Sequence, residues 1–589
     1  MNWFARDIRL PLLIGLAALV AWPFVFNTSY DLRVFTLAGI YALLVLGFQF
    51  IFGHAGALAL TQGTFFGLGA YVTGLLSVKL GWGFALTMPL SILVPLVVAL
   101  IVAAPVLRLE SHYFALATLG IGQVLLLIAI SWEPMTGGAN GLPGVAGVIL
   151  FGTAIPRGFA LAGFVWGIVA LGALAAWQLQ RGLLGRAYQV MRENDTAAMS
   201  LGIDIWHLRF VAFLLSAMYA GVAGALYVHT IRVISPEVLE FHIMVACLTM
   251  AVVGGRTAIG GAILGAFLLV HLPEWFRGLK EYYLIAYGAV LLAMIILAPD
   301  GLIGLLRSLR ERWFPAAPPA APLAVPLPTR PISRTVGPLL SVGDVSIAFG
   351  GVRALDSVSL SIAAGDIFGL IGPNGSGKTT LVNCITGIYR PSGGRIVLDG
   401  SSIERCAPYE IARRGVARTF QNINLVDSMT ALDNIAVARF DRERASFAGS
   451  LMAGRDSSLA RARGHAMYLL ERMDCAQIAM QPAGGLPYGL KRRVEIARAL
   501  ALEPTLLLLD EPAAGLNESE QADLARRLRV LADDGLTLLV IEHNMSFLMP
   551  LATRMACLDH GQRIAEGTPS QIRADPRVIE AYLGSDATV

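Results

Sequence analysis

A glycine-rich run in the second half of the 589-residue chain reads Gly372-Pro373-Asn374-Gly375-Ser376-Gly377-Lys378-Thr379-Thr380. A strand-like segment, 366–371, precedes this run, and a helix-like segment, 381–385, follows it. Together they form the G-x-x-x-x-G-K-[ST] pattern in the strand–loop–helix context of a phosphate-binding loop. Glycines let backbone N–H groups close on phosphate oxygens, and the N-terminus of the helix adds a favourable dipole. We therefore expect Lys378 to reach the β- and γ-phosphates of a nucleotide, and the Thr379 hydroxyl to ligate Mg²⁺.

An apolar run ending in two carboxylates follows further along the sequence. Four leucines, 506–509, lead directly into Asp510 and Glu511. A continuous apolar run of this kind is typical of a fully buried strand in a parallel sheet. Asp510, at the carboxyl end of that strand, can hold Mg²⁺ through water, and Glu511 can polarise the attacking water as a general base. The pattern predicts a hydrolytic nucleotide site.

Three further polar positions fit a nucleotide switch. Gln421, in the segment 418–422, could sense Mg²⁺ and the γ-phosphate. Gly489 opens a predicted helix, and its N–H group could bind a phosphate. His543 follows an apolar strand and could hydrogen-bond the γ-phosphate. Taken singly, Gln421 and His543 would more often be ordinary polar residues, so the argument depends on their order and spacing after the phosphate loop.

The composition divides the chain into two parts. Hydrophobic residues make up 56% of it and charged residues only 15%, whereas soluble domains average about 25% charged residues. Up to Arg310 there are 16 basic and 12 acidic residues, and after it 29 of each. A membrane part therefore precedes a soluble part. The balanced soluble part predicts no nucleic-acid partner, and the five unpatterned cysteines argue against a disulfide framework or a zinc site.

Apolar windows long enough for bilayer-spanning helices, each of ~20 residues, recur in the membrane part. They lie near 10–30, 34–52, 60–78, 85–107, 113–131, 158–179, 210–230, 241–255, 257–272 and 282–298. The eighth and ninth are short and glycine-rich enough to be half-helices, and the first is interpreted as a retained helix rather than a signal peptide. About ten spans with a cytoplasmic N-terminus put the soluble part in the cytoplasm, and the distribution of basic residues favours that orientation.

Two segments outside these windows differ from them in composition. The loop 181–209 combines helix formers, a mixed-charge face and an apolar face, which suits a short helix in a groove of a partner domain. An ordinary solvated loop explains the same pattern equally well. The segment 313–338 carries eight prolines and predicts a semi-rigid tether. We accordingly expect a transmembrane domain over 1–312, a linker over 313–338 and an ATP-binding domain over 339–589.

The segment 339–589 resembles the ATPase of ABC transporters over its whole length. The resemblance implies ATP contacts from Phe349, Gly372, Asn374, Gly375, Ser376, Gly377, Lys378, Thr379, Thr380, Tyr488 and Gly489. It implies catalytic roles for Glu511, His543 and Gln421, and Mg²⁺ ligation by Thr379, Gln421 and Asp510. The general signature is L-S-G-G-Q, whereas Pro487 and Tyr488 stand here in place of Ser and Gly, and Leu490 in place of Gln.

These departures, with the segments 418–421 and 580–584, look like the branched-chain amino-acid importer subgroup. The membrane part resembles the permease of the same systems, in segments 65–71, 113–119, 136–142 and 185–194. By this resemblance the protein is a polytopic all-α membrane domain followed by an α/β P-loop ABC ATPase with a helical subdomain. Gln421 matches the Q-loop of these ATPases, and the resemblance also implies a coupling helix that meets the ATPase near that loop. Its residues would be Arg192, Glu193, Asn194, Ala197 and Leu201.

The resemblance implies an assembly and a location. ABC ATPases sandwich ATP between the phosphate loop of one domain and the signature of another, so a second ATPase is expected. The expected partners are a separate permease and ATPase, or a second copy of this chain, with a periplasmic binding protein delivering an amino acid at the bacterial inner membrane. Urea, short amides and other small carboxylates are alternative cargoes. An exporter half-transporter and a non-transporting ATP-driven regulator are the alternative functions.

Overall fold

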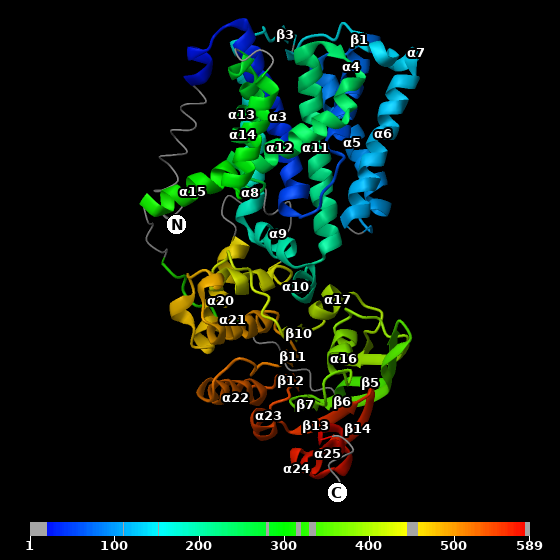
Figure 1. Ribbon diagram of the computed structural model, residues 1–589, viewed down its shortest axis with the longest axis vertical. Coiled ribbons are helices and arrows are strands. Elements are labelled where there is room, and N and C mark those ends of the chain that lie inside the picture. The colour runs from blue at the N-terminus through cyan, green and yellow to red at the C-terminus, as the bar shows by residue number, and fades with distance from the viewer. Residues whose placement is uncertain are drawn as a thin grey trace. The chain divides into compact units, whose positions relative to one another are not determined.

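The computed structural model describes residues 21–109, 111–150, 152–277, 282–313, 320–328, 337–443 and 457–583. The protein forms two compact units (Figure 1). The first comprises Met1–Gln180 and Trp206–Pro319, and the second comprises Arg181–Ile205 and Ala320–Val589. The loop that interrupts the membrane part of the sequence therefore packs with the C-terminal half of the protein.

The first unit is built mainly from helices. Its long helices are α3 Ser29–Phe48, which continues as the π-helix η1 Gln49–His54, α4 Gln62–Leu80, α5 Phe84–Val106, α6 Ser111–Ser131, α8 Phe159–Arg181 and α11 Ile205–Ile231. Shorter helices are α7 Glu133–Thr136, η2 Gly138–Asn140, η3 Pro236–Leu239, α12 Phe241–Gly254, α13 Ile259–Trp275, α14 Tyr283–Leu297 and α15 Gly301–Trp313. The unit also contains four two-residue strands, which are β1 Leu142–Pro143, β2 Ile149–Leu150, β3 Thr153–Ala154 and β4 Val233–Ile234. β1 pairs with β4, and β2 pairs with β3.

The described residues contain six helices long and apolar enough to cross a membrane, or seven if α14 and α15, bent by 47° at a break, form one span. The predicted count of about ten spans is not confirmed. The windows at 241–255 and 257–272 form α12 and α13, which are shorter than a bilayer span, as their glycine content suggested. Most of the first window lies outside the described residues. The predicted count was based on the hydropathy of each window, but whether a segment can cross the bilayer depends on the length of its unbroken helix.

Helices of the first unit approach one another at glycines. A Cβ atom on Gly69 would lie 2.4 Å from the carbonyl oxygen of Gly221, and one on Gly254 would lie 1.9 Å from that of Gly261. Buried amides add polar ties, because Gln62 Nε2 donates to the carbonyl of Leu44 (2.8 Å) and Gln62 Oε1 accepts from the Ser216 hydroxyl. Small residues and interhelical hydrogen bonds are what hold membrane helices together.

Two sheets form the body of the second unit. The six-stranded sheet has the order β10 Val416–Arg418, β11 Leu506–Asp510, β12 Thr537–Ile541, β7 Ile367–Ile371, β13 Arg554–Asp559 and β14 Gln562–Gly567, and is parallel except for the β13–β14 pair. The four-stranded antiparallel sheet has the order β6 Val352–Ala363, β5 Pro338–Phe349, β8 Gly393–Leu398 and β9 Ser401–Ser402. One apolar core joins the two sheets. Because β11, β12 and β7 are adjacent and parallel, their carboxyl ends meet at one edge.

Helices surround these sheets and build a helical subdomain from α18, α20 and α21, which contact one another. The helices are α16 Lys378–Ile385, α17 Pro408–Arg413, α18 Ala431–Ala436, η5 Val437–Arg439, α20 Ser457–Arg472, η6 Ala476–Ile478, η7 Ala483–Gly485, α21 Tyr488–Leu500, α22 Glu518–Asp533, α23 Met545–Leu551, α24 Pro569–Ala574 and α25 Pro576–Leu583. From the membrane part of the sequence come α9 Leu183–Glu193 and α10 Asp195–Ser200. The subdomain agrees with the expected ABC ATPase fold.

Part of the predicted proline-rich tether lies against the helical subdomain. The backbone N–H of Val325 donates to the carbonyl of Gly464 (2.9 Å), and His465 Nδ1 lies 3.1 Å from the carbonyl oxygen of Val325. A Cβ atom on Gly464 would lie 2.7 Å from the Val325 side chain, so glycine permits this close approach. Segments 314–319 and 329–336 of the predicted tether lie outside the described residues.

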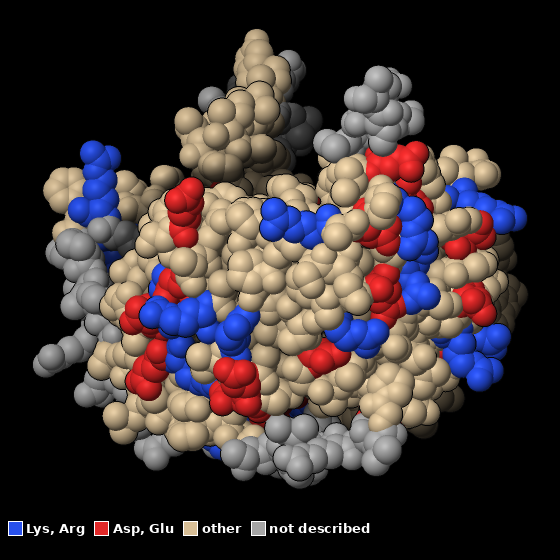
Figure 2. All heavy atoms as spheres, turned by 90° about the horizontal axis from the view of Figure 1, so that it is seen from below, with Lys and Arg blue, Asp and Glu red and all other residues tan. Residues whose placement is uncertain are grey.

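Charged side chains of both signs are mixed on the molecular face in Figure 2. Lys and Arg residues alternate there with Asp and Glu residues, and neither sign forms an extended patch on that face. Ion pairs in the second unit, such as Arg493–Asp523 (3.1 Å) and Arg577–Asp575 (2.9 Å), are of the same kind. This mixing agrees with the equal numbers of acidic and basic residues after Arg310.

Candidate active site

The phosphate loop connects the buried strand β7 to the N-terminus of α16. Gly372, Gly375 and Gly377 have φ angles of 147°, 83° and 101°, a region that side-chain-bearing residues rarely adopt. A Cβ atom on Gly372 would lie 2.1 Å from the carbonyl oxygen of Leu558. Glycine is therefore required here by both backbone angle and space. The loop delivers backbone N–H groups and a helix N-terminus to one place, as the sequence predicted.

The ammonium group of Lys378 lies within this loop. Its Nζ atom donates to the carbonyls of Gly372 and Pro373, both at 2.8 Å. Burial lowers the pKa of Lys378, while the nearby carboxylates of Glu511 and Asp510 oppose that shift. The two predicted acidic residues therefore act electrostatically on the lysine that is expected to bind phosphates.

Asp510 forms a buried ion pair that the sequence reasoning missed. Arg418 Nη2 donates to Asp510 Oδ2 at 3.1 Å, and both side chains are almost completely buried. Burial raises the pKa of Asp510, and Arg418 opposes that rise. Arg418 Nη1 also reaches Asn383 Oδ1 on α16 (2.5 Å), so one guanidinium joins the end of β11 to the helix that follows the phosphate loop.

The three residues predicted to be catalytic come together at the carboxyl ends of the strands. Glu511 Oε2 accepts a hydrogen bond from Gln421 Nε2 at 3.1 Å, and His543 Nδ1 lies 3.9 Å from Glu511 Oε1. Glu511 itself has a φ angle of 48°, in the left-handed region. Such a conformation costs about 1–3 kcal/mol and is often found at functional sites. The backbone N–H of Glu511 donates to the carbonyl of Ile541 (2.9 Å), which holds this turn against β12.

Helices α9 and α10 dock on the rest of the second unit through polar contacts. Arg186 Nε lies 3.2 Å from Asp433 Oδ1, Gln189 Nε2 donates to Ser428 Oγ (2.8 Å), and Asn194 Nδ2 donates to Asn424 Oδ1 (3.3 Å). Burial would raise the pKa of Asp433, but hydrogen bonds from Arg463 and Arg186 outweigh burial and hold it below its usual value. The segment 424–433 that receives these contacts follows Gln421 in the sequence.

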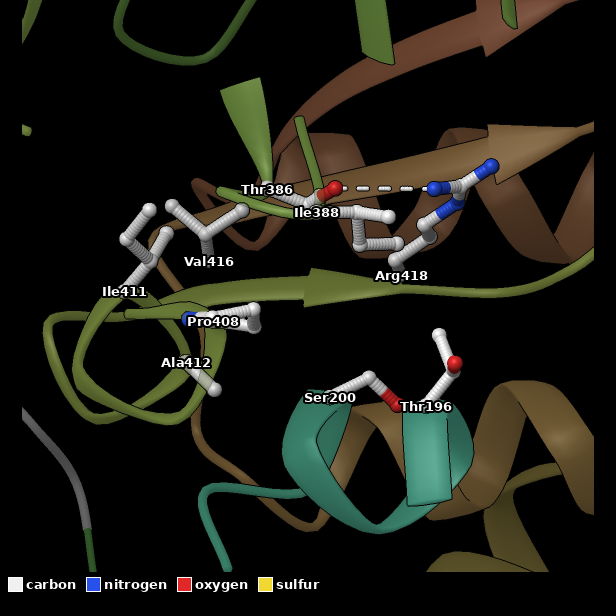
Figure 3. A pocket seen from close by; sticks show the side chains of 9 residues that line it. All are labelled: Thr196, Ser200, Thr386, Ile388, Pro408, Ile411, Ala412, Val416 and Arg418. Carbon is white, nitrogen blue, oxygen red and sulfur yellow. Dashed lines mark hydrogen bonds between the residues drawn. The ribbon is translucent and has the colours of Figure 1, made fainter. Parts of the chain in front are cut away.

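A pocket lies between α10 on one side and α17 and β10 on the other (Figure 3). Thr196 and Ser200 of α10 form one wall, and Ile411 and Ala412 of α17 lie across from them, with Arg418 at one end. The guanidinium of Arg418, which pairs with Asp510, therefore also lines the pocket beside α10. The complete lining is Thr196, Ser200, Thr386, Ile388, Pro408, Ile411, Ala412, Val416 and Arg418.

The five predicted coupling residues all belong to this docked segment. Ala197 and Leu201 are buried, and Asn194 caps α10 by accepting from the backbone N–H of Ala197 (3.0 Å). Glu193 Oε1 accepts from the Ser428 hydroxyl at 3.5 Å. Arg192 is half-buried at the end of α9.

Comparison with known proteins matches both parts of the sequence. Residues 31–299 match the model of the branched-chain amino acid transport system permease component, residues 355–514 the ABC transporter model, and residues 562–588 that of the branched-chain amino acid ATP-binding cassette transporter. The high-affinity branched-chain amino acid transport ATP-binding protein BraF of Pseudomonas aeruginosa is 42% identical over 251 residues, covering 42% of this chain and 98% of BraF. This chain belongs to the branched-chain amino acid family of ABC transporters.

A second relative matches the other part of this ABC transporter. The permease protein LivM of Salmonella typhimurium is 32% identical over 323 residues, covering 51% of this chain and 76% of LivM. Among solved structures, a nucleotide-free ATP-binding cassette from an ABC transporter shares 31% identity, with a TM-score of 0.38, covering 42% of this chain and 99% of the cassette. Permease and ATPase, which match two different relatives, are joined here in one polypeptide.

Some predicted ATP contacts of this ABC transporter lie apart from the phosphate loop. The nearest neighbours of a Cβ atom on Gly489 would be Glu520, in the first turn of α22, and Leu516, just before that helix. Phe349 is exposed at the end of β5, with its ring 5.1 Å from that of Tyr389. Tyr488, at the start of α21, is also exposed. Within the loop and its helix, Asn374, Gly375 and Thr379 are exposed, Ser376 is buried and Thr380 is half-buried.

The ABC transporter also has a contact to the phosphate loop that its motifs did not reveal. The Tyr582 hydroxyl, on α25, accepts a hydrogen bond from the backbone N–H of Gly372 at 2.9 Å. Tyr582 lies within residues 562–588, which match the model of the branched-chain amino acid ATP-binding cassette transporter. The similarity of 580–584 to the importer subgroup was the available signal, but it carried no indication of what the tyrosine contacts.

Proposed function

We propose that this protein is half of an importer that uses ATP to carry branched-chain amino acids across the bacterial inner membrane, with the ATPase unit in the cytoplasm. The observation that carries the proposal is the presence of an ATPase and a permease of one family on a single polypeptide. The permease part offers six or seven candidate spans among the described residues. The ATPase would supply the energy that moves the substrate through them.

The site residues divide into binding and hydrolytic groups. The backbone N–H groups of the loop and the Lys378 ammonium would hold the phosphates. Thr379, Gln421 and Asp510 offer hydroxyl, amide and carboxylate oxygens, which are the donors that Mg²⁺ prefers, and the bound ion would neutralise phosphate charge. Glu511 would accept the proton of the attacking water, and His543, beside it, would donate to the γ-phosphate.

A complete ATP site would need a second ATPase domain. Gly489 and Tyr488 begin α21, and Gly489 packs beside α22 rather than beside its own phosphate loop. A signature in this position would serve the phosphate loop of another domain. We therefore assign a second ATPase and a second permease, or a second copy of this chain, as partners, together with a periplasmic binding protein.

Helices α9 and α10 would couple the ATPase to the permease. Their contacts fall on 424–433, immediately after the Q-loop, and the adjoining Gly202 accepts from Arg413 of α17. Movement of Gln421 on ATP binding would therefore be transmitted to the segment that leads into α8 and α11 of the permease. Rigid-body movement of packed elements of this kind is how ATP closure can switch access across the membrane.

Uptake by the reconstituted complex tests the proposal. Proteoliposomes with binding protein on one side and ATP on the other should accumulate labelled leucine, and Glu511→Gln should bind ATP but stop both hydrolysis and uptake. Competition by valine and isoleucine, with none from urea or short amides, is expected. Competition by urea alone would assign the amide cargo, and leucine movement in the opposite direction would assign an exporter.

A further inference from the structure

Arg492 is the largest fully buried side chain among the described residues. It lies in the second turn of α21, directly after the signature, and only 1% of its surface is exposed. A buried guanidinium is costly unless charge and hydrogen bonds compensate it. The partners of Arg492 therefore indicate why it is there.

Those partners come from three nucleotide motifs. Nη1 donates to the carbonyl of Phe420 (2.8 Å), and Nη2 to the carbonyls of Gln421 (3.2 Å) and Glu511 (3.2 Å). Nη2 also reaches the hydroxyl of Tyr488 in the signature, at 3.3 Å. One guanidinium thus joins the Q-loop, the residue expected to be the general base, and the signature.

Glu495 supplies the compensating charge. Its Oε2 atom accepts from Arg492 Nη1 at 2.8 Å, and its Oε1 atom accepts from the backbone N–H of Phe420 at 3.3 Å. Both side chains of the ion pair are 1% exposed. The pair therefore grips both the N–H and the carbonyl of one Q-loop residue.

We propose that Arg492, supported by Glu495, is a positioning residue that sets the Q-loop and the general base relative to the signature helix. Glu511 sits in a strained left-handed conformation, and Arg492 holds its carbonyl while Gln421 holds its carboxylate. A rotation of α21 would displace Arg492 and with it both groups. Hydrolysis at the phosphate loop of this domain would thereby depend on the position of its own signature helix, and that signature serves the ATP bound to the partner domain. The inference rests on the ATPase activity of this site.

A lysine cannot replace this arrangement. The guanidinium directs its donors in a rigid planar fork, whereas an ammonium is a compact point charge with three donors. Arg492→Lys keeps the charge opposite Glu495 but cannot reach the carbonyls of Phe420, Gln421 and Glu511 together. The conservative variant therefore separates charge neutralisation from positioning.

The test measures ATP hydrolysis by the full-length protein in its complex, with Arg492→Lys, Arg492→Met and Tyr488→Phe. The matched control is Arg439→Met, because Arg439 is also buried in the helical subdomain but pairs with Glu503 (2.5 Å) and Glu443 (3.6 Å), outside the nucleotide motifs. The melting temperature and ATP binding in EDTA are measured for each variant.

We expect Arg492→Met and Arg492→Lys to lower kcat about tenfold or more while the KM for ATP changes less than about threefold. Tyr488→Phe should lower kcat about two- to threefold, and Arg439→Met should lower the melting temperature without changing kcat. Equal kcat losses in Arg492→Lys and Arg439→Met, or an unchanged kcat in Arg492→Lys, would overturn the proposal. If Arg492→Met does not fold, the kcat values of Arg492→Lys and Tyr488→Phe still test whether Arg492 positions the site. A wild-type complex without ATPase activity would instead refute the proposed function.

Discussion

The interactions that stabilise the interior of the first unit differ from those that stabilise the interior of the second. In the first unit, helices meet where a glycine leaves no side chain between two backbones, as at Gly254 and Gly261. In the second, buried charged side chains join distant segments, as Arg418 reaches the carboxylate of Asp510 and Arg492 the carbonyl of Glu511. Lipid provides little hydrophobic drive between helices, so shape decides their packing. An ATP site instead needs oriented polar groups. Changes of volume should therefore damage the first unit most, and changes of charge the second.

The largest effect is expected from Lys378→Ala. The substitution removes an ammonium whose partners are the carbonyls of Gly372 and Pro373 in its own loop. Loss of a preorganised charge at transferred phosphates costs about a hundredfold or more in rate. Hydrolysis and uptake should be abolished, while yield and detergent stability of the full-length protein stay near wild type. Wild-type hydrolysis by the variant would contradict the site assignment.

The next largest effect is expected from Gly254→Ala. The added Cβ atom would lie 1.9 Å from the carbonyl oxygen of Gly261, which is backbone and cannot turn aside. Overpacking of this kind costs about 1–3 kcal/mol or more. Thermal aggregation should begin at lower temperature, and uptake should fall. The control is Gly163→Ala in α8, where a Cβ atom meets nothing within 4 Å; equal stability of the two variants would refute the steric account.

A smaller and pH-dependent effect is expected from Asp433→Asn. The folded pKa of Asp433 is lowered, so its carboxylate contributes stability above the unfolded pKa, about 3.9, and that contribution is lost as the pH falls through the folded value. The variant should be less stable by about 1–3 kcal/mol at pH 7. The difference in melting temperature should shrink below about pH 4.

The same variant also tests coupling. Asp433 binds Arg186 of α9 and Arg463 of α20, so Asp433→Asn should lower leucine uptake per ATP hydrolysed more than it lowers hydrolysis. Asp427→Asn is the control, because Asp427 is exposed and its carboxylate lies 3.6 Å from the ammonium of Lys491. An equal loss of hydrolysis and uptake in Asp433→Asn would contradict the coupling role of α9.

The smallest effect is expected from Tyr582→Phe. The change removes the acceptor of the Gly372 N–H group, and a hydrogen bond of this type contributes about 0.5–1.5 kcal/mol. The KM for ATP should change by up to about tenfold, with kcat within about twofold. Ile579→Val, at an exposed position of α25, should change neither. A large fall in kcat would show that the tyrosine does more than shape the loop.

Local sequence was a good guide to the nucleotide site. The loop around Lys378, the strand ending at Asp510, and the polar residues Gln421 and His543 could be recognised because each motif stands in a fixed relation to one strand or helix. The adjacency of β11, β12 and β7 then brings these residues together. The roles of the individual residues stay predictions, but their proximity follows from the parallel sheet.

Sequence was a poorer guide where continuity of a helix or a distant partner decided the outcome. The span count depended on breaks such as the one at Gly255, whose φ angle is 121°. No general sequence motif indicates which residues are contacted by Arg418, Arg492 and Tyr582. Their contacts join residues 92, 19 and 210 positions apart.

The sequence by itself determined that a membrane part precedes an ATPase, because composition and glycine-rich loop chemistry are local properties of a polypeptide. Only the tertiary structure decided which buried guanidinium holds which carboxylate, and which side chains of the ATPase unit receive α9 and α10. Those outcomes depend on which surfaces meet after folding. The charge of a residue can be read from the sequence, but its partner is chosen by the packing that excludes water around it.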